Sequence, residues 1–284
     1  MRIPAPAIGL PLLAFALSTA AAPALADDRA CRHSAPQSLS LDIGDARRIE
    51  FHVGASKLRL EGRPGGAGSL QGRACGSSAE ELARLRLEQS REGDALVVRL
   101  AREDRSGWNL FGNNRYAYFD LSGSVPDGVR VEVSVGSGDA WASNLAELGL
   151  TVGSGDADAR RIRGTVDARV GSGDIVLADI GALDAGSVGS GDLKARGVRG
   201  DARVGSVGSG DAELADVGGR VDIGSLGSGD IGLERVTGSV EVGSIGSGDM
   251  DISGVGGDLR VRSLGSGSVD HDGVAGRVDL PRKR

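Results

Sequence analysis

The C-terminal half of the chain alternates apolar and polar residues in short runs, and glycines interrupt the alternation at regular points. Val221 and Ile223, for example, flank the charged residue Asp222. An alternation with a period of two residues predicts β-strands that bury one side. The glycines predict corners between the strands, where a positive φ costs little.

The tetrapeptide Gly-Ser-Gly-Asp recurs along this half of the chain. Copies begin at Gly136, Gly153, Gly171, Gly189, Gly208, Gly227 and Gly246, and an eighth copy at Gly265 reads Gly-Ser-Gly-Ser. The spacings are 17, 18, 18 and then four times 19 residues. The apolar positions keep the same period, and the residues before the copies are Val135, Val152, Val170, Val188, Val207, Leu226, Ile245 and Leu264.

Short strands joined by glycine corners at a constant repeat length predict a β-solenoid of about eight coils of 17–19 residues. Successive coils would stack about 4.8 Å apart, with like residues in columns and an interior of Val, Ile, Leu and Ala. The competing fold is a β-sandwich of hairpins. Such a sandwich would vary its loop lengths, and the four equal spacings speak against it.

Three regions follow from these patterns, namely a signal peptide over 1–26, a β-rich region over 27–125 and the solenoid over 126–284. The middle region has alternating segments, including 48–53 and 95–100, a hairpin turn at 91–94 and one helical turn at 78–83. We therefore predict an all-β protein. Its solenoid is preceded by an N-terminal β-rich region.

The first 26 residues have the features of a secretory signal. An apolar run extends from Ala7 to Leu17, and Ala24-Leu25-Ala26 precedes Asp27 as a cleavage site. The run is short and broken by Pro11, so we expect export without a transmembrane segment in the mature chain. In an oxidising compartment the two cysteines, Cys31 and Cys75, are expected to form a disulfide.

Charge and motifs limit the possible functions. The formal net charge of −6 leaves no basic excess for phosphates, so nucleic acid is not an expected partner. The three histidines lie in unrelated contexts. Residues 227–232 match the dinucleotide pattern Gly-x-Gly-x-x-Gly, but the sister repeats lack the third glycine. We therefore predict no catalytic residues and no cofactor.

The aspartates of the repeat would form a column of like charges in a stacked solenoid. They are Asp139, Asp156, Asp174, Asp192, Asp211, Asp230 and Asp249. One interpretation is that each carboxylate accepts hydrogen bonds from backbone N–H groups at its corner. The other is a cation held between coils, which makes these residues candidate metal ligands. We favour the first, because calcium-binding nonapeptide repeats place their aspartates at a different position and period.

A cluster of aromatic residues precedes the repeats. The segment 108–118 holds four of the chain's eight aromatic residues, and these are Trp108, Phe111, Tyr116 and Tyr118. Because terminal coils of a solenoid need covering, we favour a loop that caps its open end. The alternative is a patch that binds a sugar or a peptide, with these four side chains as its binding residues.

The run Val125-Pro-Asp-Gly-Val-Arg-Val-Glu-Val133, followed directly by the Gly-Ser-Gly-Asp repeats, resembles the exported bacterial "putative adhesin" β-strand-repeat family. That family has domains of unknown function and overlaps with auto-transporter-adhesin heads. The resemblance covers about residues 40–280. It implies a β-repeat fold and a role in surface interaction, and it carries over no catalytic or binding residues.

The sequence hypothesis is therefore a non-catalytic, adhesin-like scaffold in the periplasm, at the cell surface or outside the cell. Its expected partner is a surface, a glycan or a protein. Two alternatives stay open. One is a β-helix enzyme that acts on polysaccharides, and the other is a structural module stabilised by cations.

Overall fold

A computed structural model describes residues 31–65, 67–103 and 115–281, which lie in one compact unit that begins at Cys31. Strands form nearly all of its regular structure, with a single helical turn. Within these described ranges, no helix is long and apolar enough to cross a membrane. The predicted all-β class is confirmed.

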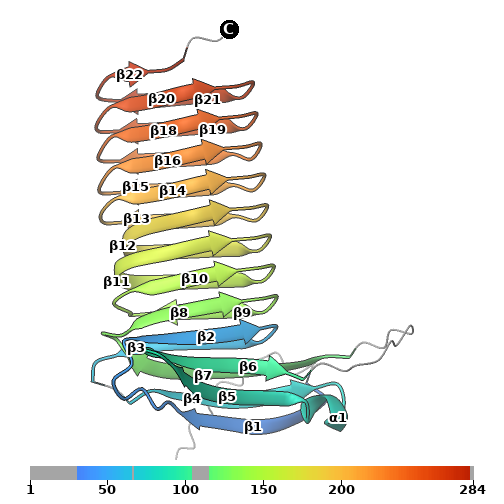
Figure 1. The fold of residues 1–284 in the computed structure, drawn as a ribbon. Coiled ribbons are helices and arrows are strands. Elements are labelled where there is room, and N and C mark those ends of the chain that lie inside the picture. Colours follow the sequence, from blue (N-terminus) through green and yellow to red (C-terminus); the bar gives the residue numbers. More distant parts are fainter. Residues whose placement is uncertain (1–30, 66, 104–114, 282–284) are drawn as a thin grey trace, which may run out of the picture. The chain divides into compact units, whose positions relative to one another are not determined.

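The chain winds through two stacks of parallel strands, which we call face A and face B (Figure 1). Face A consists of the strands that follow the Gly-Ser-Gly corners, together with β3. Its strands are β3 (Lys57–Arg63), β9 (Asp139–Ser143), the first parts of β11 (Asp156–Val170) and β12 (Asp174–Val188), β13 (Leu193–Val198), β15 (Ala212–Val217), β17 (Ile231–Val236), β19 (Asp249–Val255) and β21 (Ser268–Val274).

Face B consists of the strands that lead into those corners, together with β22 at its end. They are β2 (Arg48–Gly54), β8 (Arg130–Val135), β10 (Leu148–Val152), the second parts of β11 and β12, β14 (Ala202–Val207), β16 (Val221–Leu226), β18 (Val240–Ile245), β20 (Leu259–Leu264) and β22 (Val278–Asp279). Each strand pairs in parallel with the equivalent strand of the next coil.

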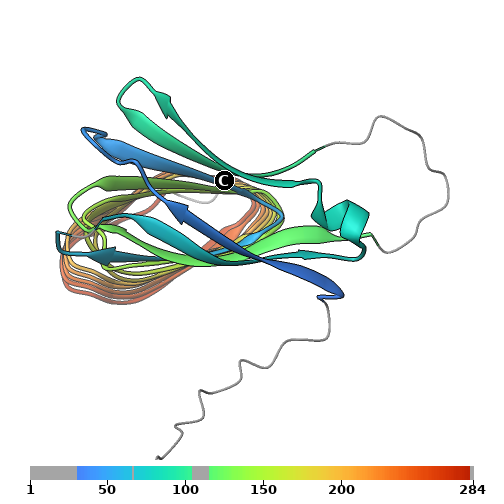
Figure 2. The same cartoon turned by 90° about the horizontal axis from the view of Figure 1, so that it is seen from below.

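Equivalent side chains lie in register from coil to coil. On face B, Val188 pairs with Val207, and Leu226, Ile245 and Leu264 continue the same column. The residues before Leu264 in this column are buried. Seen along the stack, the outlines of successive coils nearly superimpose (Figure 2). The predicted solenoid of about eight repeat coils is confirmed, and the parallel pairing excludes a sandwich of hairpins.

The Gly-Ser-Gly corners are held by backbone hydrogen bonds between coils. The N–H groups of Ser209 and Gly210 both donate to the carbonyl oxygen of Gly189, at 2.8 and 3.0 Å. A Cβ atom on Gly210 would lie 1.9 Å from the carbonyl oxygen of Gly191. The same clash, at 1.8–1.9 Å, holds for Gly155, Gly173, Gly191, Gly229, Gly248 and Gly267.

The reason predicted for these corner glycines is wrong, because none of them has a positive φ. They are needed because the stacked corners leave no room for a side chain. Positive φ values of 55–70° belong instead to one residue per coil, at the end of the face A strand farther from the Gly-Ser-Gly corner. This left-handed position is occupied by Asn144, Arg161, Asp179, Gly197, Asp216, Arg235, Gly254 and Gly273.

The lowest part of the stack comes from the N-terminal β-rich region. Strands β2 and β3 form a coil directly beneath β8 and β9. Beneath them lie β6 (Ala95–Arg102), which is parallel to β2, and β7 (Ala117–Pro126), which is parallel to β3. The antiparallel strands β5 (Leu85–Glu92), β4 (Ser69–Gly76) and β1 (His33–Ser40) then cover this base. These strands end the parallel stack at this side (Figure 1).

Two features fasten the base strands to one another. The predicted disulfide is present and joins Cys31, next to β1, to Cys75 in β4. The predicted helical turn is α1 (Ala79–Leu82), and it presents a buried carboxylate, Glu81, to two arginines. Arg84 and Arg102 donate to Glu81 at 3.0 and 2.6 Å. Burial raises the pKa of Glu81, but the Arg102 hydrogen bond and the arginine charges outweigh it, so the net pKa is lowered.

The other end of the stack becomes polar in its last coil. Within β21, His271 occupies the inward column that Leu233 and Ile252 fill below it, and it is exposed. Val278 in β22 is also exposed. A polar histidine in this inward column disfavours stacking of a further apolar coil on β21, so the apolar interior ends at this strand.

Candidate functional site

The aspartate column lies along the edge of face A, one carboxylate per coil. In its upper part, Asp192 donates its backbone N–H to the Oδ1 of Asp174 at 3.0 Å. The same bond joins each later aspartate to the one below it, and Ser268 to Asp249. The carboxylates therefore accept backbone hydrogen bonds from the next coil, whereas the first interpretation expected the donors in their own corner.

The column has different residues at its two ends. Lys57 lies below Asp139 in the register, with its Nζ 3.6 Å from Oδ2. Ser268 ends the column at the top and donates its hydroxyl to Asp249 at 2.9 Å. In the part of the chain that the structure describes, no group of three or more His, Cys, Asp or Glu side chains could hold a metal ion. Calcium binding by the column stays a hypothesis to test.

The predicted aromatic patch is described only in part. Trp108 and Phe111 lie outside the described residues. Tyr116 and Tyr118 have ring centroids 6.1 Å apart, tilted by 41°. The Tyr116 hydroxyl accepts the backbone N–H of Arg32 at 3.1 Å, and burial raises the pKa of Tyr118. These two rings therefore pack beside the disulfide-linked base strands, and their role in binding stays a prediction.

A groove of about 610 Å³ opens on face A where the lowest coils meet the base strands. Trp141 of β9 contributes to its wall. Because Ala140 and Ala142 on either side point inward and are buried, the indole lies on the outer surface. The guanidinium of Arg59 in β3 stacks over the face of the indole ring as a cation–π contact, 4.3 Å from the ring centroid. We call this site the Trp141 groove.

Charged side chains surround Trp141. Arginines at positions 59, 63, 160 and 161 line the groove together with only two carboxylates, Glu61 and Asp158. Arg63 and Arg160 pair with these carboxylates, each at 2.8 Å. Arg59 pairs with Asp120 of β7, also at 2.8 Å. With Asp120 counted, three carboxylates offset three of the four guanidiniums, and Arg161 is the excess positive group, although the whole chain is acidic.

Arg161 differs from the other arginines of the groove. It occupies the left-handed position of its coil with φ of 55°, where most other coils have Gly, Asn or Asp. Such a conformation costs about 1 kcal/mol for a residue with a long side chain. Its Nε donates to the neutral side-chain oxygen of Asn144 at 2.7 Å. Arg235, the other arginine in this position, instead pairs with a carboxylate, that of Asp216.

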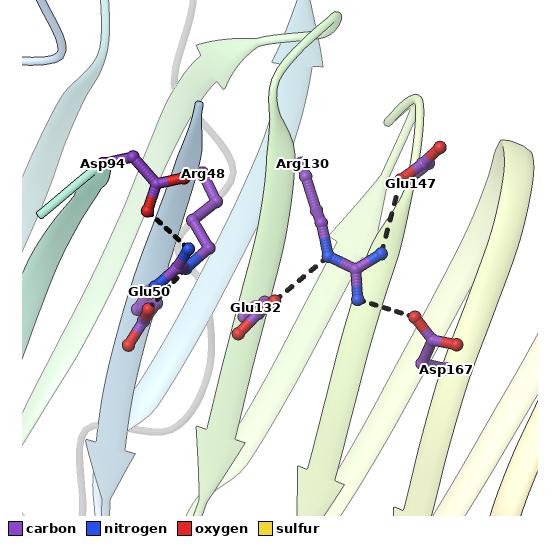
Figure 3. Close-up of polar contacts among 7 residues, drawn as sticks. All are labelled: Arg48, Glu50, Asp94, Arg130, Glu132, Glu147 and Asp167. Carbon is purple, nitrogen blue, oxygen red and sulfur yellow. Dashed lines mark hydrogen bonds and ion pairs between the residues drawn. The ribbon is translucent and has the colours of Figure 1, made fainter. Parts of the chain in front are cut away.

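Face B carries an ion-pair network that spans three coils (Figure 3). Arg130 of β8 donates to Glu132 at 3.0 Å, to Glu147 at 3.3 Å and to Asp167 at 2.6 Å. The hydrogen bond with Asp167 is the largest cause that raises the pKa of Arg130. Because every charge in this network has a partner, we assign it to the stability of the stack rather than to ligand binding.

Gly149 lets the Arg130 side chain reach Asp167 past the coil between them. A Cβ atom on this glycine would lie 3.2 Å from Cγ of Glu132 and 3.6 Å from Nη2 of Arg130. One coil below, Arg48 makes similar bonds to Glu50 at 2.7 Å and Asp94 at 2.6 Å (Figure 3).

The structure brings none of the three histidines near another. His33 lies in β1, His52 in β2 and His271 in β21. The segment that matches the dinucleotide pattern places Gly227 and Gly229 in a corner and Gly232 in strand β17, with no helix after it. It therefore lacks the strand-to-helix turn on which phosphate binding by that motif depends.

Sequence reasoning did not single out the Trp141 groove. One signal was present, because residue 141 stands between two inward positions and must point outward. The other coils have Asp158, Val176, Lys194, Glu213, Gly232, Asp251 and Asp270 at this place. Its contact with Arg59 could not be inferred, because β4 to β8 separate the two strands in the sequence.

Neither the known family models nor the curated proteins contain a match to this chain. Solved structures do match. A protein named "putative adhesin" from Parabacteroides merdae is 16% identical, with a TM-score of 0.56 over 84% of this chain and 96% of that chain. The likeness is one of fold. It agrees with the resemblance that the sequence showed to adhesin-type β-strand repeats.

Two further solved structures come from Parabacteroides distasonis. One, also named "putative adhesin", is 13% identical, with a TM-score of 0.46 over 84% of this chain and 97% of that chain. The other, named "putative lipid binding protein", is 18% identical, with a TM-score of 0.37 over 86% and 97%.

Proposed function

We propose that this chain is an exported, non-catalytic scaffold of adhesin type, which contacts a surface, a glycan or a protein through the sides of its solenoid. One observation supports this most directly. The inward columns repeat a few aliphatic residue types, whereas the outward position of face A changes from Trp141 to Asp158, Val176 and Lys194 in four successive coils. A constant interior with a variable exterior suits display of a contact surface.

A non-catalytic role also fits the carboxylates of the Trp141 groove. A glycosidase needs one carboxylic acid that donates a proton and a second carboxylate that acts as base or nucleophile. Glu61 and Asp158 are instead each held in an ion pair by an arginine, at 2.8 Å. This arrangement agrees with a structural role for the two carboxylates.

Export is part of the proposal. The disulfide between Cys31 and Cys75 agrees with folding in an oxidising compartment, and the signal peptide predicted over 1–26 would deliver the chain there. We propose the periplasm or the outer side of the cell as its location. Mass spectrometry of the mature protein from the native envelope should then show an N-terminus at Asp27.

A binding assay tests the proposed contact role. The labelled mature chain is applied to whole cells and to a glycan array, and the same glycans are assayed for release of reducing ends. We expect saturable binding without cleavage, and heat-unfolded chain serves as the control. Absence of saturable binding to every surface and glycan would refute the scaffold role. Released sugar fragments would establish the polysaccharide-active alternative.

A further inference from the structure

We propose that the Trp141 groove binds acidic glycans, meaning sugar chains that carry carboxylate or sulfate groups. This inference rests on the proposed contact function and names its ligand class and its site. Three observations carry it, namely the half-buried, outward-facing indole, the positive lining and the ring of small polar side chains.

One face of the Trp141 indole is covered by the Arg59 guanidinium, so a sugar ring would stack on the face turned toward Asp158. The indole stands on the outer surface of face A, between Arg59 in the coil below and Asp158 in the coil above. Aromatic side chains in such places pair an apolar face with neighbouring polar groups, and this suits the C–H face and the hydroxyls of a pyranose. No other tryptophan follows in the solenoid.

The lining selects for negative charge. Three of its four guanidiniums pair with Glu61, Asp120 or Asp158, and Arg161 adds one positive charge in excess, in a chain whose formal net charge is −6. Arg161 is bonded to a neutral amide oxygen, so its remaining N–H donors are not committed to a carboxylate. Guanidinium groups bind carboxylate and sulfate oxygens through paired hydrogen bonds, which are stronger than those between neutral groups.

Small polar side chains complete the groove. Ser69 and Gln71 come from β4, Ser122 and Ser124 from β7, and Ser143 from β9. Hydroxyl and amide groups on rigid strands can bond sugar hydroxyls without much loss of side-chain freedom. The groove thus combines a stacking surface, a fixed positive charge and neutral hydrogen-bonding groups.

The backbone strain at Arg161 agrees with this assignment. Asparagine or glycine would suit a φ of 55° better, and both occur at this position in neighbouring coils. From an arginine here the fold gains one hydrogen bond, to Asn144, but no ion pair with a carboxylate. A strained residue whose charge the fold does not use is expected where that charge serves binding.

Fluorescence of Trp141 allows a direct binding test. The mature chain has two tryptophans, so Trp108→Phe leaves Trp141 as the only one. Into this background we place Trp141→Ala or Arg161→Asn, with Arg235→Asn as the matched control at the same left-handed position four coils higher. Probes are an oligogalacturonate, a heparin hexasaccharide and neutral maltohexaose, measured by fluorescence and by isothermal titration calorimetry, with melting curves to verify folding.

We expect the acidic probes to bind and maltohexaose not to bind. Arg161→Asn should weaken binding about fivefold, since a partly exposed ion pair is worth up to about 1 kcal/mol. Trp141→Ala should weaken it about tenfold, Arg235→Asn should leave it unchanged, and added salt should reduce it.

Equal binding of acidic and neutral probes would overturn the inference, and so would unchanged binding by both groove variants. The whole-cell assay separates this inference from the proposed function. If the wild-type chain binds cells and the groove variants bind them equally well, the scaffold role stands and the groove is not its contact site. If the wild-type chain binds no surface or glycan, both proposals fail.

Discussion

Replacing Gly210 with alanine tests how the stacked corners hold the solenoid together. The added Cβ atom would lie 1.9 Å from the carbonyl oxygen of Gly191, whereas non-bonded heavy atoms prefer about 3.5 Å. The two corners must therefore separate by about 1.5 Å. This movement breaks the hydrogen bonds that Ser209 and Gly210 donate to Gly189, which are now 2.8 and 3.0 Å long.

The size of the effect follows from these broken bonds. Each lost hydrogen bond costs about 1 kcal/mol, and each N–H group left without a partner adds about 1 kcal/mol or more. We therefore expect Gly210→Ala to lower the free energy of unfolding by about 3–5 kcal/mol, or the melting temperature by about 10 °C. Hydrogen exchange should show lost protection in the coils on both sides of the corner, because each coil is stabilised by its neighbours.

A glycine outside the corners provides the control. Gly232 lies in strand β17, and a Cβ atom there would meet only Cγ of Glu213, at 3.8 Å. Alanine in a strand is slightly more favourable than glycine, so Gly232→Ala should keep or slightly raise the melting temperature. Circular dichroism melting curves compare the two variants. A Gly210→Ala protein that melts like the wild type would refute the steric explanation of the corners.

Three further outcomes test other parts of the structure. The lowered pKa of Glu81 means that its carboxylate stabilises the fold above its unfolded value of 4.5 and loses this effect as the pH falls below it. Melting curves between neutral and acidic pH should therefore show a smaller acid effect in Glu81→Gln, and an equal effect would contradict this. Millimolar calcium or a chelator should leave the melting temperature unchanged, because backbone N–H groups already donate to the Oδ1 atoms of the upper aspartates. A clear rise in melting temperature with calcium would favour the cation-stabilised module. Reducing the Cys31–Cys75 disulfide, which spans 44 positions, should cost about 3–4 kcal/mol and loosen the base strands in hydrogen exchange, whereas unchanged protection there would show that it contributes little.

The N-terminal half shows where local sequence patterns are insufficient. The alternation at 48–53 and the turn at 91–94 were visible and correspond to β2 and the β5–β6 hairpin. Strands β4 and β7 were not predicted. Glycines and serines interrupt the alternation throughout β4, whereas β7 alternates over 117–121 and loses the pattern only at its second half. Gly72 and Gly123 are there because β4 and β7 pack closely, and a Cβ atom on either would lie 2.1 Å from a carbonyl oxygen of the other strand. Only the pairing of the two strands reveals that requirement.

The coil formed by β2 and β3 shows the same limit. Its corner reads Gly54-Ala55-Ser56 instead of Gly-Ser-Gly, so a search for the repeat does not find it. The backbone nevertheless makes the bonds of a repeat corner, since Gly138 donates to Gly54 at 3.0 Å and Asp139 to Ser56 at 3.0 Å. The hydrogen bonds of the corner need the right backbone path and not one particular tetrapeptide.

By itself the sequence determined the coil, its length and the residues inside it. Each inward column must repeat the same kind of side chain once per coil. The sequence therefore shows the length of the coil directly, as the spacing between equivalent apolar residues. Only the tertiary structure decided which outward residues meet. Arg59 and Trp141 are neighbours because the chain builds the base strands β4 to β7 after β3 and then returns to pair β8 and β9 with β2 and β3. Such a pairing between distant segments has no period to reveal it.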